Sequence, residues 1–387
     1  MKRFLLCLLI LTLLSGACAQ AEELTQEAFE QYLTARFRAR KVACGAVVIS
    51  KDGEIVCRFA YGSINSRKTL PAHTDTIFRV ASVTKLVSAI GLMRLYDQGL
   101  FDLDAPAERI LGVPVENPKF KGQAVTPRQI LSHTSGLKQK NYYLFPWKQF
   151  SASAGYYTKE RPGAAYQYSN LNGGLIGSMI ELLSGQSVFT YMRENVFDPL
   201  GVTATYALHL LPDWETREIA YVFSKDGQRF ITPKKYCQDT SKYRDEPDPE
   251  NHLAVTVGNL FISAEDLNAL TNVLLLDGEY RGVRLLSGET VRLMEQDQAA
   301  LPGSSVTGES RYGLSLARVT GLTGGTWYGH QGLKDGLSAD AFYQRETGLA
   351  VVVIGDGYAP MNRNGVVTLA SEVMEYAAQM ALDGAWK

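Results

Sequence analysis

Residues that bind metals or form disulfides are scarce in this sequence. Its 387 residues include only 5 His and 5 Cys, and they are scattered rather than grouped at the short spacings of metal ligands. No H-E-x-x-H helix motif occurs and no C-x-x-C pair occurs, so a metallohydrolase fits poorly. The G-x-S-x-G string of an α/β-hydrolase nucleophile is missing as well, which argues against that class of enzyme.

An excess of charge of either sign is also missing. Lys and Arg together number 39 and Asp and Glu together 40, so the formal net charge is -1 at pH 7. There is no basic stripe with interleaved aromatic residues, and no internal repeat. Such a chain has no global field that attracts nucleic acid or an anionic membrane. We therefore expect a globular protein without a nucleic-acid partner, long enough for one large or two joined domains.

A single hydrophobic run lies at the start of the chain. Two basic residues precede an apolar stretch, residues 4–14, which is shorter than the roughly 20 residues of a membrane-spanning helix. The small residues A-C-A at 17–19 match a cleavage site. We interpret residues 1–19 as a secretory signal peptide and expect export to the periplasm or cell envelope. Cys18 leaves open a second interpretation, in which lipoprotein processing attaches a lipid to this cysteine.

Two further cysteines raise the question of a disulfide. Cys44 and Cys57 lie on the two strands of a predicted hairpin, in a compartment that would be oxidising. A tight turn at residues 52–53 would pair Cys57 with a residue near Val48 and would leave Cys44 out of register. A disulfide and two buried free thiols therefore both remain open.

Strand signals gather at the two ends of the chain. Residues 45–50 and 54–60 are apolar and β-prone and flank Asp52-Gly53, which indicates a hairpin. Residues 339–343 and 349–354 form a second such pair around a polar turn. Helices are predicted outside both pairs, at residues 24–40 and 366–382.

The middle of the chain is mostly helical by its pattern. Residues 82–98 carry apolar side chains at helical spacing and end at Gly99, and residues 171–183 form another helix closed by Gly185. Residues 213–251 are polar and charged and predict an excursion over the surface. We therefore predict an α+β protein, with an antiparallel sheet flanked by helices and an inserted, mostly helical lobe. The single unit covers residues 20–387, with the sheet lobe at about 20–80 and 252–387 and the helical lobe at about 81–251.

The strongest chemical signal lies at the start of the helix at residues 82–98. Its S-V-T-K string puts Ser82 and Lys85 on one face, so the lysine amine can point at the serine hydroxyl. Lys85 would accept the serine proton near neutrality only if its pKa fell by about 3 from roughly 10.4, which costs about 4 kcal/mol and which burial can supply. The ordinary alternative is a helix-capping serine with a solvated lysine. A second S-x-x-K string, at residues 135–138, lies in a Gly-containing turn instead.

A tyrosine and an asparagine follow on a loop that leads into the next helix, in the string Y-S-N at residues 168–170. Tyr168, beside two ammonium groups, could ionise and serve as a base. Asn170 could hold a substrate amide and position Lys85. The alternative is an aromatic residue that closes a loop and an asparagine that caps a helix.

A third string, H-Q-G at residues 330–332, completes the set. Gly332 would let a substrate backbone lie alongside as an added strand. His330 could hydrogen-bond to Tyr168 and lend positive character to the site. The alternative is a satisfied structural histidine beside a glycine turn.

Together these strings resemble the penicillin-recognising serine hydrolases, the group of class C β-lactamases, D-alanyl-D-alanine carboxypeptidases and related esterases. The resemblance extends from about residue 44 to 357. The segments that carry it are residues 78–85, 99–104, 126–137, 166–170, 197–201 and 328–332. His133 and Ser135 fall in a segment that is structural in this family, so they are not expected in the site.

The resemblance implies an α+β fold of the β-lactamase type and a role for each matching residue. Ser82 would be acylated, with Lys85 and Tyr168 sharing the proton transfers. The oxyanion would lie between the backbone N–H groups of Ser82 and Leu333. Asn170 would bind the acyl-side amide of the substrate, and His330 would support Tyr168. No cofactor and no metal would be needed.

The third string departs from one branch of the family. The β-lactamases of this branch usually carry K-T-G where this chain has H-Q-G, and a histidine there is more similar to the carboxypeptidases and esterases. Gln331 replaces the Thr or Ser whose hydroxyl helps to hold a substrate carboxylate. Its amide can still donate a hydrogen bond, and Lys334 lies close enough in sequence to compensate in part.

Three functions are consistent with these residues. The first is an exported, penicillin-binding D-alanyl-D-alanine carboxypeptidase or another D-amino-acid peptidase. The second is a β-lactamase or promiscuous esterase with the same site. The third is a non-catalytic sensor that is acylated once by a penicillin. The expected substrate is a small peptide, a β-lactam or an ester, and a monomer is expected.

Overall fold

A computed structural model describes residues 26–138, 154–298, 311–363 and 366–386. Residues 1–25, with the predicted signal peptide and Cys18, lie outside this range. Within the described ranges, no helix is both long and apolar enough to span a membrane.

A seven-stranded antiparallel sheet forms the centre of the molecule, in the order β10-β11-β12-β13-β14-β1-β2. The first strand of the chain lies beside the last strand of this sheet, because β1 pairs with β14 along its whole length. This arrangement confirms the predicted α+β class with an antiparallel sheet built from both ends of the chain. The strands are β1 Cys44–Lys51, β2 Glu54–Gly62, β10 Arg311–Tyr312, β11 Ala317–Leu322, β12 Gly325–Lys334, β13 Leu337–Gln344 and β14 Leu349–Asp356.

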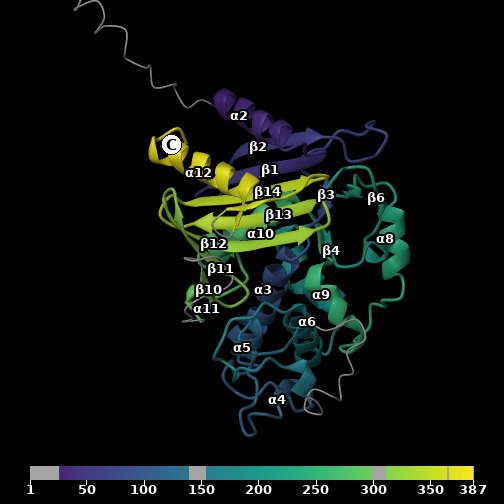
Figure 1. The fold of residues 1–387 in the computed structure, drawn as a ribbon, viewed down its shortest axis with the longest axis vertical. Coiled ribbons are helices and arrows are strands. Elements are labelled where there is room, and N and C mark those ends of the chain that lie inside the picture. The colour runs from purple at the N-terminus through teal and green to yellow at the C-terminus, as the bar shows by residue number, and fades with distance from the viewer. Residues whose placement is uncertain (1–25, 139–153, 299–310, 364–365, 387) are drawn as a thin grey trace, which may run out of the picture.

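Helices cover both faces of the sheet (Figure 1). On one face, α2 (Gln26–Ala39) and α12 (Thr368–Leu382) lie side by side, and Phe29 of α2 stacks on Tyr376 of α12. The opposite face packs on α10 (Ala264–Leu275) and on α3 (Val83–Asp97). Two hydrophobic cores result, one on each side of the sheet.

The helical part of the molecule is built on α3, which is buried on nearly all sides and packs against α6 (Asn170–Ser184). Both helices begin and end within a residue or two of their predicted limits. The other helices of this part are α4 Glu108–Leu111, α5 Pro127–Leu131, α7 Val188–Met192 and α9 Val255–Gly258. The remaining elements are α11 Gly288–Glu295 and the short strands β3 Ile77–Arg79, β4 Ala204–Thr205, β7 Phe261–Ser263, β8 Glu279–Tyr280, β9 Val283–Arg284, β15 Asn362–Arg363 and β16 Val366–Val367.

The polar segment at residues 213–251 has more structure than predicted. It holds a two-stranded hairpin, β5 (Val222–Phe223) with β6 (Phe230–Ile231), and the helix α8 (Pro233–Thr240). The Thr232 side chain accepts a hydrogen bond from the Lys235 backbone and so caps α8. The hairpin is fastened to the sheet, because the Phe223 backbone N–H donates to the buried Asp356 carboxylate at 3.1 Å.

The structure decides between the two interpretations of the cysteines. A bulge between Ile49 and Ser50 aligns Cys57 with Ile49, whereas Cys44 lies opposite Gly62 near the far end of the hairpin. The two thiols also belong to different cores, on opposite faces of the sheet. Cys44 and Cys57 are both buried thiols that form no disulfide in the described part of the chain, so the predicted possibility of a disulfide between them is wrong.

Candidate active site

Ser82 lies at the N-terminus of α3, directly after the strand β3. The residue before it, Ala81, has a φ of 44°, in the left-handed region that a residue with a Cβ atom rarely adopts. Strained backbone of this kind persists only where the surrounding structure holds it, and it often occurs at functional sites. This backbone conformation places the serine side chain at the N-terminus of a buried helix.

Lys85 points at the Ser82 hydroxyl, as the spacing predicted. Its Nζ lies 3.2 Å from Ser82 Oγ and donates a 2.6 Å hydrogen bond to the carbonyl oxygen of Val257. The side chain is completely buried, and burial lowers the pKa of Lys85 to about 7. The alternative of a solvated lysine is therefore wrong. The predicted contact from Asn170 to Lys85 is absent from the described residues, and the Val257 carbonyl stands in its place.

A glycine lets Lys85 run between the two central helices. A Cβ atom at Gly173 of α6 would lie 2.6 Å from Lys85 Cε, closer than real Cβ contacts. Only glycine at this position lets α6 approach the buried lysine stem.

Tyr168 lies over Lys85, with Nζ 5.1 Å from the ring centroid. Its hydroxyl is buried and lies near Ser82, but it has no hydrogen bond of good geometry within the described chain. Burial raises the pKa of Tyr168 well above its usual value, and the nearby Ser82 hydroxyl offsets this only in part. Burial thus favours the protonated phenol at neutral pH, and the ionisation of Tyr168 stays a prediction. Asn170 is the first residue of α6 and is half-buried beside this loop.

His133 supports the Tyr168 ring. The two rings lie 4.4 Å apart, and His133 Nδ1 accepts hydrogen bonds from the Ser169 backbone at 3.3 Å and from Asn172 at 3.1 Å. Asn172 is held in turn by the Ser135 hydroxyl at 2.8 Å. These contacts agree with a structural role for His133 and Ser135. They also bring the segment into direct contact with a site residue, which the sequence did not indicate.

His330 lies in the same cluster but has other partners than predicted. Its Nδ1–H donates to the Gln331 carbonyl at 2.6 Å, and its Nε2 then accepts from the Tyr312 hydroxyl at 3.0 Å. Its ring is 6.4 Å from that of Tyr168. Burial lowers the pKa of His330 to about 3, with neighbouring Lys85 a further cause. The imidazole is therefore neutral, so the predicted positive character and the predicted bond to Tyr168 are both wrong.

The strand β12 passes the start of α3 at Gly332. A Cβ atom there would lie 2.2 Å from the Val80 carbonyl oxygen and 2.7 Å from the Ser82 backbone nitrogen, so no other residue fits. Side chains alternate along a strand, and Trp327 packs in the core beneath α2 and α12. Gln331 and Leu333 therefore direct their side chains to that face, away from Ser82. The predicted role of the Gln331 side chain in holding a substrate carboxylate is not supported, because only its backbone borders the site.

One edge of β12 is open next to Ser82. β11 pairs with β12 only as far as Gly329, whereas β13 pairs with β12 through Lys334. Within the described residues, the stretch 330–334 thus has a strand neighbour on one side only. An open edge of this kind can accept an extended peptide. The backbone N–H of Leu333, the second predicted oxyanion donor, belongs to this stretch.

Three further features of the site were not predicted. Val257 acts through a backbone carbonyl, which leaves no mark in a sequence. Tyr312 reaches His330 from a strand eighteen positions earlier, and only the pairing of β10, β11 and β12 brings it there. The strained φ of Ala81 has no residue-type signal at all. Within the described chain, no group of three or more His, Cys, Asp or Glu could hold a metal.

Comparison with known proteins gives this geometry a context. A family model described as Beta-lactamase matches residues 26–367. Penicillin-binding protein 4* of Bacillus subtilis (strain 168) is 26% identical over 207 residues, which are 49% of this chain and 44% of that protein. Esterase EstB of Burkholderia gladioli is 30% identical over 246 residues, which are 56% of this chain and 57% of the esterase. The chain thus spans about half the length of these curated relatives.

The fold is shared with solved structures. An octameric penicillin-binding protein homologue from Pyrococcus abyssi aligns with a TM-score of 0.70 at 23% identity, over 92% of this chain and 77% of that chain. This likeness confirms the expected α+β fold. Because the family model covers most of its length, this chain belongs to the Beta-lactamase family, and the resemblance to the penicillin-recognising serine hydrolases is confirmed.

Proposed function

We propose that the protein is a serine hydrolase that works through an acyl-enzyme on Ser82. One observation carries the proposal: a completely buried lysine lies 3.2 Å from the serine hydroxyl, with its pKa lowered to about 7. At neutral pH about half of such lysines are neutral and able to accept the serine proton. Belonging to the Beta-lactamase family supports the same chemistry.

In the acylation step, Lys85 Nζ accepts the proton from Ser82 Oγ while Oγ bonds to the substrate carbonyl carbon. Negative charge develops on the carbonyl oxygen, which the backbone N–H groups of Ser82 and Leu333 would stabilise. The close approach of Gly332 to the Ser82 nitrogen supports this placement of β12.

Tyr168 supplies the second proton transfer. Its raised pKa keeps the hydroxyl protonated, so it can donate to the leaving group as the bond to carbon breaks. The Lys85 ammonium then returns a proton to the tyrosine oxygen. Water attacks the acyl-enzyme by the reverse sequence and releases the acid. Asn170 would hold the acyl-side amide from the start of α6.

We favour a D-amino-acid peptide, such as one ending in D-alanyl-D-alanine, as the substrate. The open edge of β12 suits a peptide backbone. The B. subtilis relative is named a penicillin-binding protein, which fits an enzyme of this substrate class. The expected export would bring the protein to peptides outside the cytoplasm.

An esterase is the second candidate, since Esterase EstB is among the more similar relatives at 30% identity. A β-lactamase would differ from the peptidase by rapid deacylation of the adduct formed with a penicillin. A sensor would differ by keeping that adduct.

One experiment separates these functions. The protein without residues 1–19 and its Ser82→Ala variant are incubated with a penicillin, and adduct mass is followed with time beside release of D-alanine from a D-Ala-D-Ala peptide. Ser82-dependent release of D-alanine supports the peptidase. No adduct and no release would leave the esterase. Rapid loss of the adduct with turnover would indicate a β-lactamase, and a permanent adduct without peptide turnover a sensor.

A further inference from the structure

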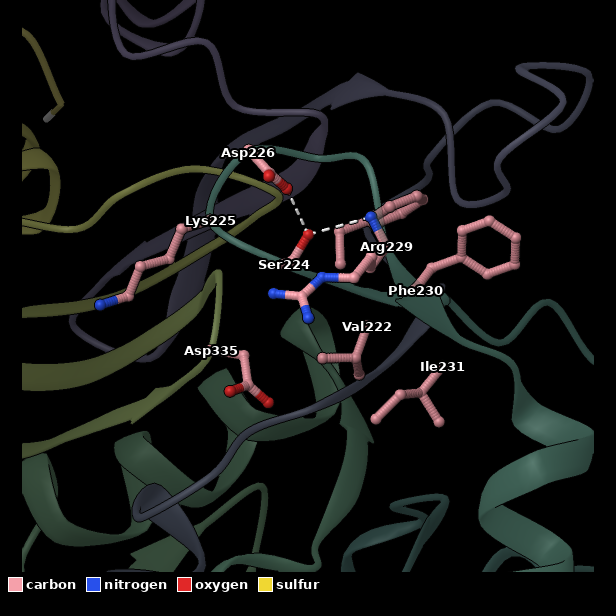
Figure 2. Close-up of a pocket in the computed structure, with 9 residues that line it drawn as sticks. Val222, Ser224, Lys225, Asp226, Arg229, Phe230, Ile231 and Asp335 are labelled. Atoms are coloured by element: carbon pink, nitrogen blue, oxygen red, sulfur yellow. Dashed lines mark hydrogen bonds between the residues drawn. The ribbon is translucent and has the colours of Figure 1, made fainter.

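A pocket of about 380 Å³ lies between the β5–β6 hairpin and the turn that joins β12 to β13 (Figure 2). Val222, Phe223 and Ile231 give it an apolar floor, and Lys225, Arg229 and Asp335 stand around its mouth. Its volume is in the range of pockets that hold small molecules.

The two walls of the pocket are fixed to each other by backbone contacts. Gly336 N–H donates to the Phe223 carbonyl at 3.1 Å, and a Cβ atom at Gly336 would lie 2.6 Å from the Ser224 backbone. The turn of the hairpin is tied internally, since Ser224 Oγ accepts from the Arg229 backbone at 3.0 Å and donates to Asp226. The pocket therefore exists before any ligand binds, which lowers the entropic cost of binding.

The pocket lies at the end of the open edge described above. Gly332 lies against the Ser82 nitrogen, and Asp335 follows it by three residues along β12 and its turn. At about 3.3 Å per residue, Asp335 lies within roughly 10 Å of Gly332, the residue that contacts the Ser82 nitrogen. A substrate that extends along residues 330–334 reaches it with about three residues, or with an acyl chain of similar length.

The charged side chains around the pocket differ in how many partners they have: the carboxylates have partners, and two cations have none among the described residues. Asp226 accepts hydrogen bonds from Ser224 and from the Gln228 backbone, and Asp335 lies 3.6 Å from Lys334. Among the described residues, neither the Lys225 ammonium nor the Arg229 guanidinium makes an ion pair or a side-chain hydrogen bond. Figure 2 shows the guanidinium between Ser224 and Asp335, over the middle of the pocket. Two cations are available to a ligand, and Asp226 and Asp335 offset part of their charge, so the pocket suits one carboxylate better than a more highly charged group.

We propose that this pocket binds a carboxylate on the substrate of the Ser82 site, about three residue lengths from the scissile carbonyl. Arg229 and Lys225 would hold the carboxylate, and the apolar floor would contact the chain before it. The proposal rests on the serine hydrolase function. It makes the two cations specificity-determining residues rather than catalytic ones.

The test compares two synthetic esters that share one leaving group. N-adipoyl-D-alanine p-nitrophenyl ester carries a free carboxylate at the required distance, and its ω-methyl ester is neutral. Release of p-nitrophenol gives kcat/KM for each, whatever the natural leaving group is. We expect wild type to prefer the carboxylate about tenfold, and Lys225→Gln with Arg229→Gln to lower this ratio to about one. Lys234→Gln, an equal change of charge on α8 outside the pocket, should keep the wild-type ratio.

The outcomes separate the two proposals. Equal rates for both esters in wild type, or an unchanged preference in the double variant, would overturn the pocket assignment alone. A loss of preference in Lys234→Gln would reduce the effect to general surface charge and would also overturn it. No release that depends on Ser82, judged against Ser82→Ala, would overturn the serine hydrolase and the pocket together.

Discussion

At the scale of single residues, burial creates the base of the site. Among the described residues Lys85 has no carboxylate partner, and it forms hydrogen bonds with the Ser82 hydroxyl and the Val257 carbonyl. Loss of solvation therefore dominates and lowers its pKa to about 7. Burial lowers the pKa of both neighbouring imidazoles, so among the described residues of the site Lys85 is the group whose protonation changes near neutral pH.

This pKa predicts the pH dependence of the reaction. The neutral amine is the active form, so kcat/KM for a p-nitrophenyl ester should rise with pH through a midpoint of about 7. Lys85→Arg, which stays charged, should lose about 10²–10⁴-fold in kcat/KM. Lys138→Arg, in the second S-x-x-K string, is the matched control and should keep the wild-type rate and profile. A profile flat from pH 5 to 9 would count against Lys85 as the base.

Gly332 offers a second test at this scale. In Gly332→Ala the new methyl group would meet the Val80 carbonyl and the Ser82 nitrogen, both backbone atoms that cannot turn aside. We expect a loss of about 1–3 kcal/mol in the free energy of unfolding and a fall of about 10² in acylation rate as Ser82 is displaced. Urea unfolding and burst kinetics measure the two.

Gly258→Ala is the control, because its nearest neighbour would be 3.5 Å away, an ordinary contact. If Gly332→Ala matched this control in stability and in acylation rate, the close approach of β12 to Ser82 would be refuted.

At the scale of elements, the helix α6 and the segment that supplies the Val257 carbonyl are joined by a buried hydrogen bond between Glu181 and His252. Glu181 of α6 binds His252 Nδ1 at 2.7 Å and accepts backbone hydrogen bonds from Val188 and Asp248 at 2.8 and 2.9 Å. Val257 follows His252 by five residues. The contact that positions Lys85 therefore depends on an anchor about two turns further along the same face of α6, since Gly173 beside Lys85 and Glu181 are eight residues apart.

Glu181→Ala should cost about 3–5 kcal/mol in the free energy of unfolding, because it leaves His252 and two N–H groups buried without their partner. Where the variant still folds, at low temperature, kcat should also fall as Val257 moves from Lys85. Chemical unfolding and ester hydrolysis test both effects. Glu194→Ala, an exposed change one helix away, should alter neither, and a stable, fully active Glu181→Ala would contradict the coupling.

The elements also show how far sequence reasoning reaches. The Asp52-Gly53 turn, the apolar runs of β13 and β14 and the glycine-terminated helices α3 and α6 were predictable, because their signals are local. The hairpin β5–β6 was not predictable, because its strands are only two residues long. It is held by a hydrogen bond to Asp356, which lies 133 residues further along the chain than Phe223. Thr232 and Pro233 are a local signal for the start of α8, although that helix was not predicted.

For the site, local strings indicated Ser82, Lys85, Tyr168, Asn170 and His330, and the family resemblance favoured their functional interpretation over the structural one. The protonation states of Tyr168 and His330 were predicted less well. Burial raises the pKa of Tyr168 and lowers that of His330, so it favours the neutral form of both side chains, and the Lys85 charge adds to the effect on His330. Depth of burial is set by how the sheet and helices pack, and no short string encodes it.

At the scale of the whole molecule, the sheet contains a buried acid that opposes folding at neutral pH. Both carboxylate oxygens of Asp340 are buried without a hydrogen-bond partner in the described chain, and burial raises its pKa well above the usual value. The native state therefore keeps a proton that the unfolded chain loses above about pH 4. Stability from this residue must fall as pH rises from that point.

Asp340→Asn should thus be increasingly more stable than wild type as pH rises, by up to about 1.4 kcal/mol per pH unit above pH 4. Urea unfolding at pH 4 to 8 measures the difference, in which other titrating groups cancel. Asp239→Asn, an exposed change on α8, should run parallel to wild type. Parallel curves for Asp340→Asn as well would show that the carboxyl finds a partner in solution.

The pairing of β1 with β14 also constrains how the protein is made. Lys51 lies opposite Leu349, so about 300 residues must leave the ribosome before this pair can form. At about 5–20 residues per second, β1 and β2 would wait roughly 15–60 s for their neighbour. During that time the edge of β1 that β14 later covers would be exposed. A hairpin with a free apolar edge is a place where nascent chains stick to one another or to a chaperone.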